Sequence, residues 1–408
     1  MQAVIISNAE SPELEQLTVL GSASLLPLGN ETILTKLVNI FIMSEILDVV
    51  IVHNKTQTVR LTNFINENRR FWPAYMKVNL LELPTFYSLS EILLTIRSSV
   101  TSDYLFIAYS NTVINEINLR DIFLTMIRRR ASIVAVFSSL PATESRLLKF
   151  LSSELTVTTI DGNTLITYAT ASDIKKQSKL SKNLRCQETI LCRSDLRDCG
   201  LYLISRLALD RIVKTGENIT YHKRSIWQYI WSDPPEINQE NNREFNGEFD
   251  INNGPNYTEC RQVGGACIHE HHDKIISIKF EDPLVYVETN RLIMQNSSSL
   301  IGLQPSGKEA NIIHESSVVD NKASIRASFV SASCIIGADV KVLNSVLLSN
   351  AEIKDNCTVQ GCVIGEKAVV EELCHLKFCA VAALQRVPTG TILESKRLGF
   401  TDPELNAT

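Results

Sequence analysis

The most constraining feature of the sequence is a regular recurrence of aliphatic residues between positions 313 and 376. They follow one another at intervals of six, six and five, so seventeen residues return the chain to an equivalent point. These intervals do not match the 3.6-residue period of an α-helix. They predict a left-handed parallel β-helix of hexapeptide repeats over residues 310–390. The aliphatic positions are Ile313, Val319, Ile325, Val330, Ile336, Val342, Leu347, Ile353, Val359, Ile364, Val370 and Leu376.

A second set of positions, four residues after each aliphatic residue, is mostly small, and we expect it to face inward at the corners of the coils. The set is Ser317, Ala323, Phe329, Cys334, Val340, Val346, Ala351, Cys357, Val363, Ala368, Cys374 and Ala380. Cys362 and Cys379 lie one residue earlier in the repeat, and we expect the same packing role for them. Ten cysteines without a secretion signal predict reduced thiols in the cytosol.

Residues 1–233 alternate short apolar runs with helix-length segments, which predicts an α/β domain with a mostly parallel sheet and helices on both faces. The expected strands are 3–7, 48–52, 77–83, 104–109, 132–137 and 198–205, and the expected helices are 31–46, 56–70, 88–98, 119–130 and 206–214. In such a sheet, ligands bind beyond the carboxyl ends of the strands.

Composition excludes several functions. Charged residues make up 21% of the chain and the net charge is -5, so binding of nucleic acid through neutralised phosphates is not expected. The run Arg128–Arg130 is interpreted as a solvated helix end. No stretch approaches the roughly 20 apolar residues of a membrane span. We therefore expect a cytosolic protein with neither a membrane nor a direct nucleic-acid partner.

Between the two regions the composition changes after Asp233. Residues 234–273 are rich in Asn, Glu and Gly, which predicts a flexible linker. Its end carries possible zinc ligands, but their spacing lacks the paired short intervals of structural zinc modules, so a surface segment entering a strand is favoured. Residues 274–309 are expected to connect to the β-helix, and 391–408 to form a C-terminal tail. The possible ligands are Cys260, Cys267, His269, His271 and His272.

The beginning of the chain, "VIIS" followed by a loop and "LLPLGN", resembles the nucleotidyltransferases that make nucleotide sugars and their relatives among initiation factors. In those enzymes the loop is rich in glycine and carries an arginine and a Pro-Lys-Pro, which serve a nucleoside triphosphate. Here Glu10, Pro12, Glu13 and Glu15 occupy the loop, and Ser22-Ala23-Ser24 replaces Pro-Lys-Pro. A working triphosphate cradle is therefore not expected.

Two further places of that family's site also differ. Ser88-Leu89-Ser90-Glu91 stands where the enzymes admit the base, and the capped start of a helix is favoured there. Ser110-Asn111 follows a strand where the enzymes hold magnesium with an aspartate. Asp198 remains as a possible second metal ligand, though a structural role is favoured. We expect no catalytic, cofactor-binding or metal-binding residues and no cofactor.

The order of the two regions is shared by nucleotide-sugar pyrophosphorylases and by the gamma and epsilon subunits of eukaryotic translation initiation factor 2B. The chain resembles gamma subunits in "MQAVIIS", "LLPLGN", "SDLRDCGLYLISR", "SIWQYIW", "YVETNR" and the coils from "VVDNKASI" to "VVEELCHLKFCAV". It ends 28 residues after Ala380, without the helical domain that carries exchange activity in epsilon.

The resemblance implies a non-catalytic subunit of a guanine-nucleotide exchange factor, with the epsilon and other subunits as partners and initiation factor 2 as substrate. A nucleotide-sugar pyrophosphorylase or its inactive regulatory subunit is the alternative. A hexapeptide acyltransferase would need an activating histidine between subunits. The repeats offer only His314 and His375, which are interpreted as corner or surface residues.

Overall fold

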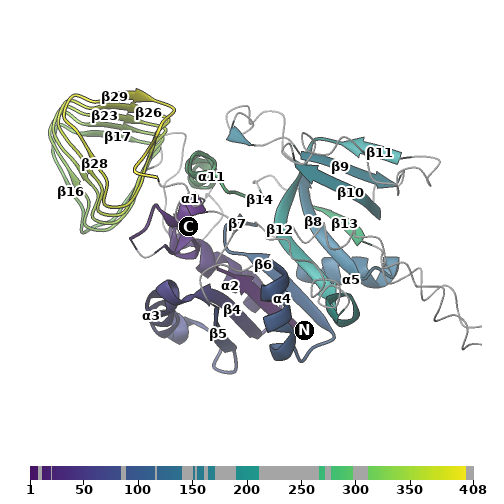
Figure 1. Ribbon diagram of the computed structural model, residues 1–408. Helices are drawn as coiled ribbons and strands as arrows, with labels where there is room; N and C mark the ends of the chain where they lie inside the picture. Colours follow the sequence, from purple (N-terminus) through teal and green to yellow (C-terminus); the bar gives the residue numbers. More distant parts are fainter. Residues whose placement is uncertain are drawn as a thin grey trace, which may run out of the picture.

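The computed structural model consists of a large sheet with helices on both faces and a separate β-helix (Figure 1). It describes residues 1–7, 12–19, 21–83, 89–114, 117–139, 150–151, 154–159, 164–170, 190–210, 266–271, 277–296 and 311–400. Glu10, Ser88, Cys260, His272 and most of the predicted linker lie outside these residues. Both predicted classes of architecture, an α/β domain and a left-handed β-helix, are confirmed.

The large sheet has ten strands, seven of which run in one direction, and four of its nine pairs of neighbouring strands are parallel. Strands β5, β4, β1, β6, β8, β13 and β9 run in one direction, and β12 runs against its neighbours β6 and β8. Its order is β11 (Ile190–Arg193), β9 (Glu154–Thr159), β10 (Thr164–Thr170), β13 (Ala266–His271), β8 (Ile133–Ser139), β12 (Leu196–Ser205), β6 (Tyr104–Tyr109), β1 (Gln2–Ile6), β4 (Asp48–Asn54) and β5 (Lys77–Leu83).

Alternate residues of each central strand pack on opposite faces of the sheet, as the pleat requires. Ala3 and Ile5 of β1 belong to the core under α2 (Ile33–Met43), α3 (Thr58–Asn68) and α5 (Leu119–Arg129). Val4 and Ile6 belong to the core under α4 (Leu89–Ser99) and the helical residues 206–210. Both faces of the sheet are therefore buried, which explains the continuous apolar runs of the strands.

Helix α2 begins two residues later than predicted because its N-terminus is part of a small hairpin. β2 (Pro27–Leu28) pairs with β3 (Glu31–Thr32), and the Thr32 hydroxyl accepts a hydrogen bond from the Thr35 N–H at 3.1 Å. This side chain satisfies one of the unpaired donors of the first turn. The short 3-10 segments η1 (Ala23–Leu25), η2 (Lys55–Gln57) and η3 (Arg69–Phe71) flank the neighbouring helices.

Strand β13 shows that the predicted linker, 234–273, contains part of the sheet. Its residues pair in parallel with β8, with His269 opposite Val136. The segment predicted only to connect to the β-helix contains the strand β14 (Ile278–Lys279) and the helix α11 (Pro283–Asn296). Tyr286 of α11 is fully buried, so this helix is part of the core.

The β-helix has three flat sheets, each formed by stacking one short strand from every coil. The first sheet is β15 (Ile312–Ile313), β18 (Phe329–Val330), β21 (Val346–Leu347), β24 (Val363–Ile364), β27 (Ala380–Val381) and β30 (Arg397–Leu398). The second is β16 (Val318–Val319), β19 (Ile335–Ile336), β22 (Glu352–Ile353), β25 (Val369–Val370) and β28 (Arg386–Val387). The third is β17 (Ser324–Arg326), β20 (Lys341–Leu343), β23 (Thr358–Gln360), β26 (His375–Lys377) and β29 (Ile392–Glu394).

The register confirms the seventeen-residue repeat. Every strand pairs in parallel with its counterpart seventeen residues later, as Val330 does with Leu347 and Ile353 with Val370. The predicted aliphatic residues from Val330 to Leu376 form the interior of the coils. Ile313 is 43% exposed and does not fit the prediction, because it lies in the first coil and has no preceding coil to cover it. The last two strands, β29 and β30, lie in the predicted tail, where Leu393 and Leu398 continue the repeat after Val387.

One of the three corners departs from the predicted pattern of small inward residues. Phe329, Val346, Val363 and Ala380 face outward and share a core with the α/β domain. The inward places are held by the preceding residues, Ser328, Ser345, Cys362 and Cys379, which are almost completely buried. At this corner, successive inward aliphatic residues are five positions apart instead of six. The small inward residue therefore comes three rather than four positions after the aliphatic residue. The packing role expected for Cys362 and Cys379 is thereby confirmed.

Burial in the coils predicts different costs for two adjacent isoleucines on β19. Ile336 is 2% exposed inside the coil, whereas Ile335 is 51% exposed on its outer surface. We expect Ile336→Ala to lower the free energy of unfolding by about 2–5 kcal/mol because it leaves a cavity. Ile335→Ala is the matched control and should change it by no more than about 0.5 kcal/mol. Urea unfolding followed by circular dichroism measures both, and equal effects would contradict the assigned facing.

Candidate functional site

The carboxyl ends of β1, β4 and β6 meet at one edge of the sheet, where ligands of such folds bind. Ser7 follows β1, and its hydroxyl lies 2.9 Å from the Ser24 hydroxyl and 3.0 Å from the Gln57 side-chain oxygen. The Ser110 hydroxyl donates to the Ser7 carbonyl at 3.2 Å. All four residues are fully buried. The polar groups at this edge therefore bond to one another.

Asn111 stands where the resembled enzymes place a metal-binding aspartate, and here it holds a backbone segment. Its amide nitrogen donates to the Phe280 carbonyl at 2.7 Å, and the Phe280 N–H donates to the Asn111 carbonyl at 3.0 Å. The neighbouring strands β14 and β7 (Thr112–Val113) pair antiparallel. This corner thus anchors the segment that leads into α11.

Asp198 is held by the irregular part of β12. Its carboxylate accepts a hydrogen bond from the Gly200 N–H at 2.8 Å and another from the Tyr202 hydroxyl. The register of β12 against β8 shifts between Asp198 and Tyr202, and Gly200 has a φ of +67°. A Cβ at Gly200 would lie 2.4 Å from the Thr112 hydroxyl, so only glycine fits. These bonds give Asp198 a structural role in the bulge.

The loop after β1 contacts the β-helix through α1 (Pro12–Glu15) and the residues that follow it. The Gln16 carbonyl accepts from the Ala383 N–H, and the Leu17 carbonyl from the Glu366 N–H, each at 2.8 Å. The Val19 N–H donates to the Glu366 carboxylate at 2.9 Å. We call residues 12–19 the docking segment. Its backbone groups, which follow the loop that serves phosphate in the resembled enzymes, bind the coils here.

Two charged contacts strengthen this attachment. Arg397 on β30 pairs with Glu13 of the docking segment and with Asp282, which precedes α11. Arg60 of α3 directs one guanidinium nitrogen at both carboxylate oxygens of Glu366, at 2.8 Å each. Glu13, which repels phosphate, is therefore paired with a cation of the β-helix. This ion pair explains why an acidic residue is present in a loop that carries cations in the resembled enzymes.

The "LLPLGN" and "YVETNR" motifs contact one another. The Pro27 carbonyl accepts from the Tyr286 hydroxyl at 2.6 Å and from the Asn290 amide at 2.9 Å. The Asn290 oxygen accepts from the Gly29 N–H at 3.0 Å. Gly29 has a φ of +66°, and a Cβ there would come within 3.3 Å of Ile293. The turn at residues 27–29 is thus shaped to receive α11.

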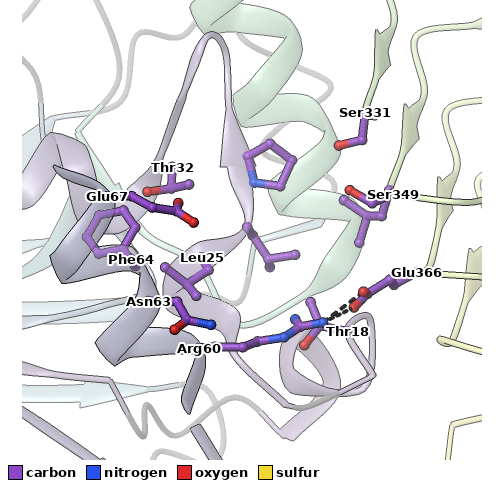
Figure 2. A pocket seen from close by; sticks show the side chains of 13 residues that line it. Thr18, Leu25, Thr32, Arg60, Asn63, Phe64, Glu67, Ser331, Ser349 and Glu366 are labelled. Carbon is purple, nitrogen blue, oxygen red and sulfur yellow. Dashed lines mark hydrogen bonds and ion pairs between the residues drawn. The ribbon is translucent and has the colours of Figure 1, made fainter. Parts of the chain in front are cut away.

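A pocket of about 340 Å³ opens where α3, the hairpin and the β-helix meet (Figure 2). Figure 2 shows Arg60 and Glu366 along one side, Phe64 and Glu67 of α3 opposite the coils, and Ser331 and Ser349 on the β-helix side. It is lined by Thr18, Leu25, Leu26, Pro27, Thr32, Arg60, Asn63, Phe64, Glu67, Ser331, Leu348, Ser349 and Glu366. The sequence gives no sign of this site, because each lining residue is unremarkable in its own segment.

Glu15 is the most perturbed carboxyl group of the docking segment. Burial raises the pKa of its side chain to about 8. The Gln57 amide, which also donates to the Gly21 carbonyl at 2.6 Å, is 3.5 Å from one Glu15 oxygen. Glu15 is therefore protonated in the folded protein at neutral pH, so it adds no charge to the edge of the sheet there.

The remaining candidate residues are not brought together into a site. In the part of the chain that the structure describes, no group of three or more His, Cys, Asp or Glu side chains is placed to hold a metal. Nδ1 of His269 lies 3.3 Å from the Thr125 hydroxyl of α5. His314, at the corner after β15, and His375, on β26, are both exposed, as expected. Burial raises the pKa values of the Cys334 and Cys357 thiols to about 11, which fits packing residues.

Helix α4 begins at Leu89, which confirms the start of a helix within Ser88–Glu91. Its predicted cap, Ser88, lies outside the described residues. The arginines 128–130 are exposed at the end of α5, as predicted. None of the helices in the described part of the chain has the length and apolar character that a membrane crossing requires.

Removing Glu366 should loosen the docking segment. Glu366→Ala deprives the Val19 N–H of its acceptor and Arg60 of its partner. Hydrogen bonds to charged groups contribute about 1.5–3 kcal/mol, so amide exchange at Val19 should become about 10–100-fold faster. Hydrogen-exchange mass spectrometry measures this. Glu394→Ala, which breaks the exposed pair with Lys377, is the control and should leave Val19 unchanged. Unaltered amide exchange at Val19 in Glu366→Ala would contradict the attachment of the docking segment through Glu366.

The raised pKa of Glu15 makes stability depend on pH. Between an unfolded pKa near 4.5 and a folded value of about 8, the folded state binds more protons. Stability should therefore fall as pH rises through this window and level off above it. Glu15→Gln should remove about 1–3 kcal/mol of this dependence and flatten the profile of melting temperature between pH 5.5 and 8.5. Glu45→Gln, on the turn after α2, serves as control. Identical profiles for wild type and Glu15→Gln would contradict the burial of this carboxyl.

The comparisons with known proteins concern the second half of the chain. A search of curated proteins found no match. The family model described as the GMPPB C-terminal domain matches residues 308–395. This range covers the β-helix strands from Ile312 to Glu394. The C-terminal region of the chain is thus similar to a left-handed β-helix domain of the nucleotide-sugar pyrophosphorylase type.

Proposed function

We propose that this chain is a non-catalytic subunit of the translation initiation factor 2B complex, similar to its gamma subunit. In this proposal it supports the catalytic epsilon subunit and helps bind initiation factor 2, while the exchange of GDP for GTP takes place elsewhere in the complex. The observation that carries the non-catalytic part of the proposal is the docking segment, and the choice of complex rests on the resemblance of the sequence motifs to gamma subunits. Residues that follow the phosphate loop of related enzymes are here bonded to the β-helix through Glu366 and Arg397.

The edge of the sheet supports this proposal in a second way. Ser110, Asn111 and Asp198, at the family's metal positions, bond to neighbouring backbone and side-chain groups. A triphosphate and its magnesium ion require charged oxygen ligands and free donors at this edge. The groups present there are committed to holding the segment before α11 and the bulge of β12.

The outer surfaces of the β-helix support a role in holding other proteins. The second and third sheets lie away from α11 (Figure 1), and their strands expose Val318, Ile335 and Ile392 by 51–74%. Leu373 and Leu384 are exposed at corners between strands. Apolar side chains on a flat, rigid surface are typical of contacts between subunits. In this proposal they face partner subunits of the complex in the cytosol.

A second candidate function is favoured by the family match. The GMPPB C-terminal domain is of the nucleotide-sugar pyrophosphorylase type, so an inactive regulatory subunit of such an enzyme would have the same β-helix. The docking segment and the edge of the sheet fit this alternative equally well, because neither distinguishes the partner. The two candidates differ in what the chain binds.

An acyltransferase is the least supported of the three. Such enzymes use a histidine at a cleft between coils of neighbouring subunits. Nδ1 of His314 lies 2.9 Å from the Ser316 hydroxyl of its own corner, and His375 is on the outer side of β26.

Affinity capture tests the proposed partners. We expect the tagged chain, expressed in its own cells, to be recovered in equal amounts with an epsilon-like subunit and to associate with initiation factor 2. The reason is that the exposed apolar side chains of the coils require cover. Quantitative mass spectrometry of the purified complex measures this. Recovery of a nucleotide-sugar pyrophosphorylase would favour the second candidate, and a stable lone monomer would refute both.

A turnover assay tests the absence of catalysis. With sugar 1-phosphates, nucleoside triphosphates and magnesium, we expect no release of pyrophosphate above the background of the Asp198→Asn variant, which lacks the remaining candidate metal ligand. The reason is that the docking segment and Asn111 are engaged in structural bonds. Magnesium-dependent release that Asp198→Asn abolishes would overturn the non-catalytic proposal.

A further inference from the structure

The pocket between α3 and the β-helix has the composition of a ligand site that neither the edge of the sheet nor the proposed subunit role uses. Its walls come from three separate parts of the chain: α3, the segment from Thr18 to Thr32, and the coils around Ser349. Its volume of about 340 Å³ lies at the lower end of the range of small-molecule sites. A nucleotide sugar is too large for it, whereas a single sugar ring is of the right size.

The polar groups of the pocket include both donors and acceptors that have no partner within the described residues. Arg60 binds Glu366 through one nitrogen, which leaves its other guanidinium N–H groups for a ligand. The Asn63 amide, the Glu67 carboxylate and the hydroxyls of Ser331 and Ser349 also have no partner there. Ser331 is 8% exposed and Ser349 is half-buried, whereas Asn63 and Glu67 are exposed on α3.

The charged residues that line the pocket indicate which class of ligand it can bind. Of the described residues that line the pocket, Arg60 is the only cationic one, and Glu366 already pairs with it. Glu67 contributes a further carboxylate, so the pocket has a net negative charge that disfavours phosphate. Carboxylate, amide and hydroxyl groups instead match the alternating donors and acceptors of neighbouring sugar hydroxyls.

The apolar part of the lining complements these groups. Leu25, Pro27 and Leu348 provide C–H surface, and the ring of Phe64 lies at the wall formed by α3 (Figure 2). A pyranose ring has an apolar face as well as polar edges, so it can contact such a wall while its hydroxyls bond to the opposite side. We propose that this pocket binds a neutral polyhydroxylated small molecule of the size of a monosaccharide.

A ligand here would bridge the two domains. Ser331 and Ser349 belong to the β-helix, whereas Asn63 and Glu67 belong to α3. A molecule bonded to both sides adds to the Arg60–Glu366 contact and stabilises the docked arrangement. The inference concerns a site apart from the proposed partner surfaces, so it does not depend on which complex contains the chain.

The test is saturation-transfer NMR with D-glucose as the probe, on the full chain or on the complex in which it is purified. We expect transfer to glucose protons with wild type and none with Ser349→Trp, whose indole fills the pocket. Lys341→Trp places the same ring on the exposed third sheet and is the matched control, which should retain the signal. Asn63→Ala, at an exposed position of α3 that should tolerate the change, is expected to weaken binding about fivefold by loss of one hydrogen bond.

A second arm separates sugar from anion. Inorganic phosphate, followed by the ³¹P line width, should not bind, and it should not displace glucose. Absence of glucose transfer with wild type, equal transfer with Ser349→Trp, or binding of phosphate that Ser349→Trp removes would each overturn the proposal. These readouts are independent of partner capture, so failure of one proposal is distinguishable from failure of the other.

Discussion

Helix α11 lies where the two halves of this molecule meet, and its hydrogen bonds with the turn at residues 27–29 hold it to the α/β domain. Tyr286 and Asn290 meet the Pro27 carbonyl, and Gly29 allows the backbone to come close to Ile293. Beside this contact, the outward residues Phe329, Val346, Val363 and Ala380 join the apolar core of the α/β domain. Because burial of apolar surface is the main favourable contribution to such contacts, the β-helix and the sheet are attached through a shared core.

This attachment changes the role of the loop after β1. In a nucleotide-binding relative, the loop has to remain available for phosphate, and its glycines and cations serve that purpose. Here the loop leads into the docking segment, whose backbone groups pair with Glu366 and Ala383. Replacement of cations by Glu13 and Glu15 is then physically consistent, because one carboxylate pairs with Arg397 and the other is neutralised by burial.

The β-helix was predictable in detail because its repeat is local: each inward residue is determined by its distance from the next. The α/β alternation was also visible, and several strand bounds coincide with the prediction, as for Lys77–Leu83 and Tyr104–Tyr109. What the pattern missed depends on contacts between distant segments. Val346 is buried although it faces outward, because its sheet packs on the core that contains α11, and β13 is a strand through its pairing with β8. The pocket at Arg60 likewise exists only because three segments converge.

The parallel register of the coils also limits how the length of this protein can vary. Each strand residue pairs with the residue seventeen positions later. At one inward corner position a side chain also bonds to the next coil, because the Cys362 N–H donates to the Ser345 hydroxyl. An insertion of one residue would turn the following aliphatic residues outward in every later coil. An insertion of seventeen residues adds one complete turn and leaves all three faces in place. The β-helix can therefore be lengthened only by whole coils. Each added coil moves the terminal coil along the axis by the same distance.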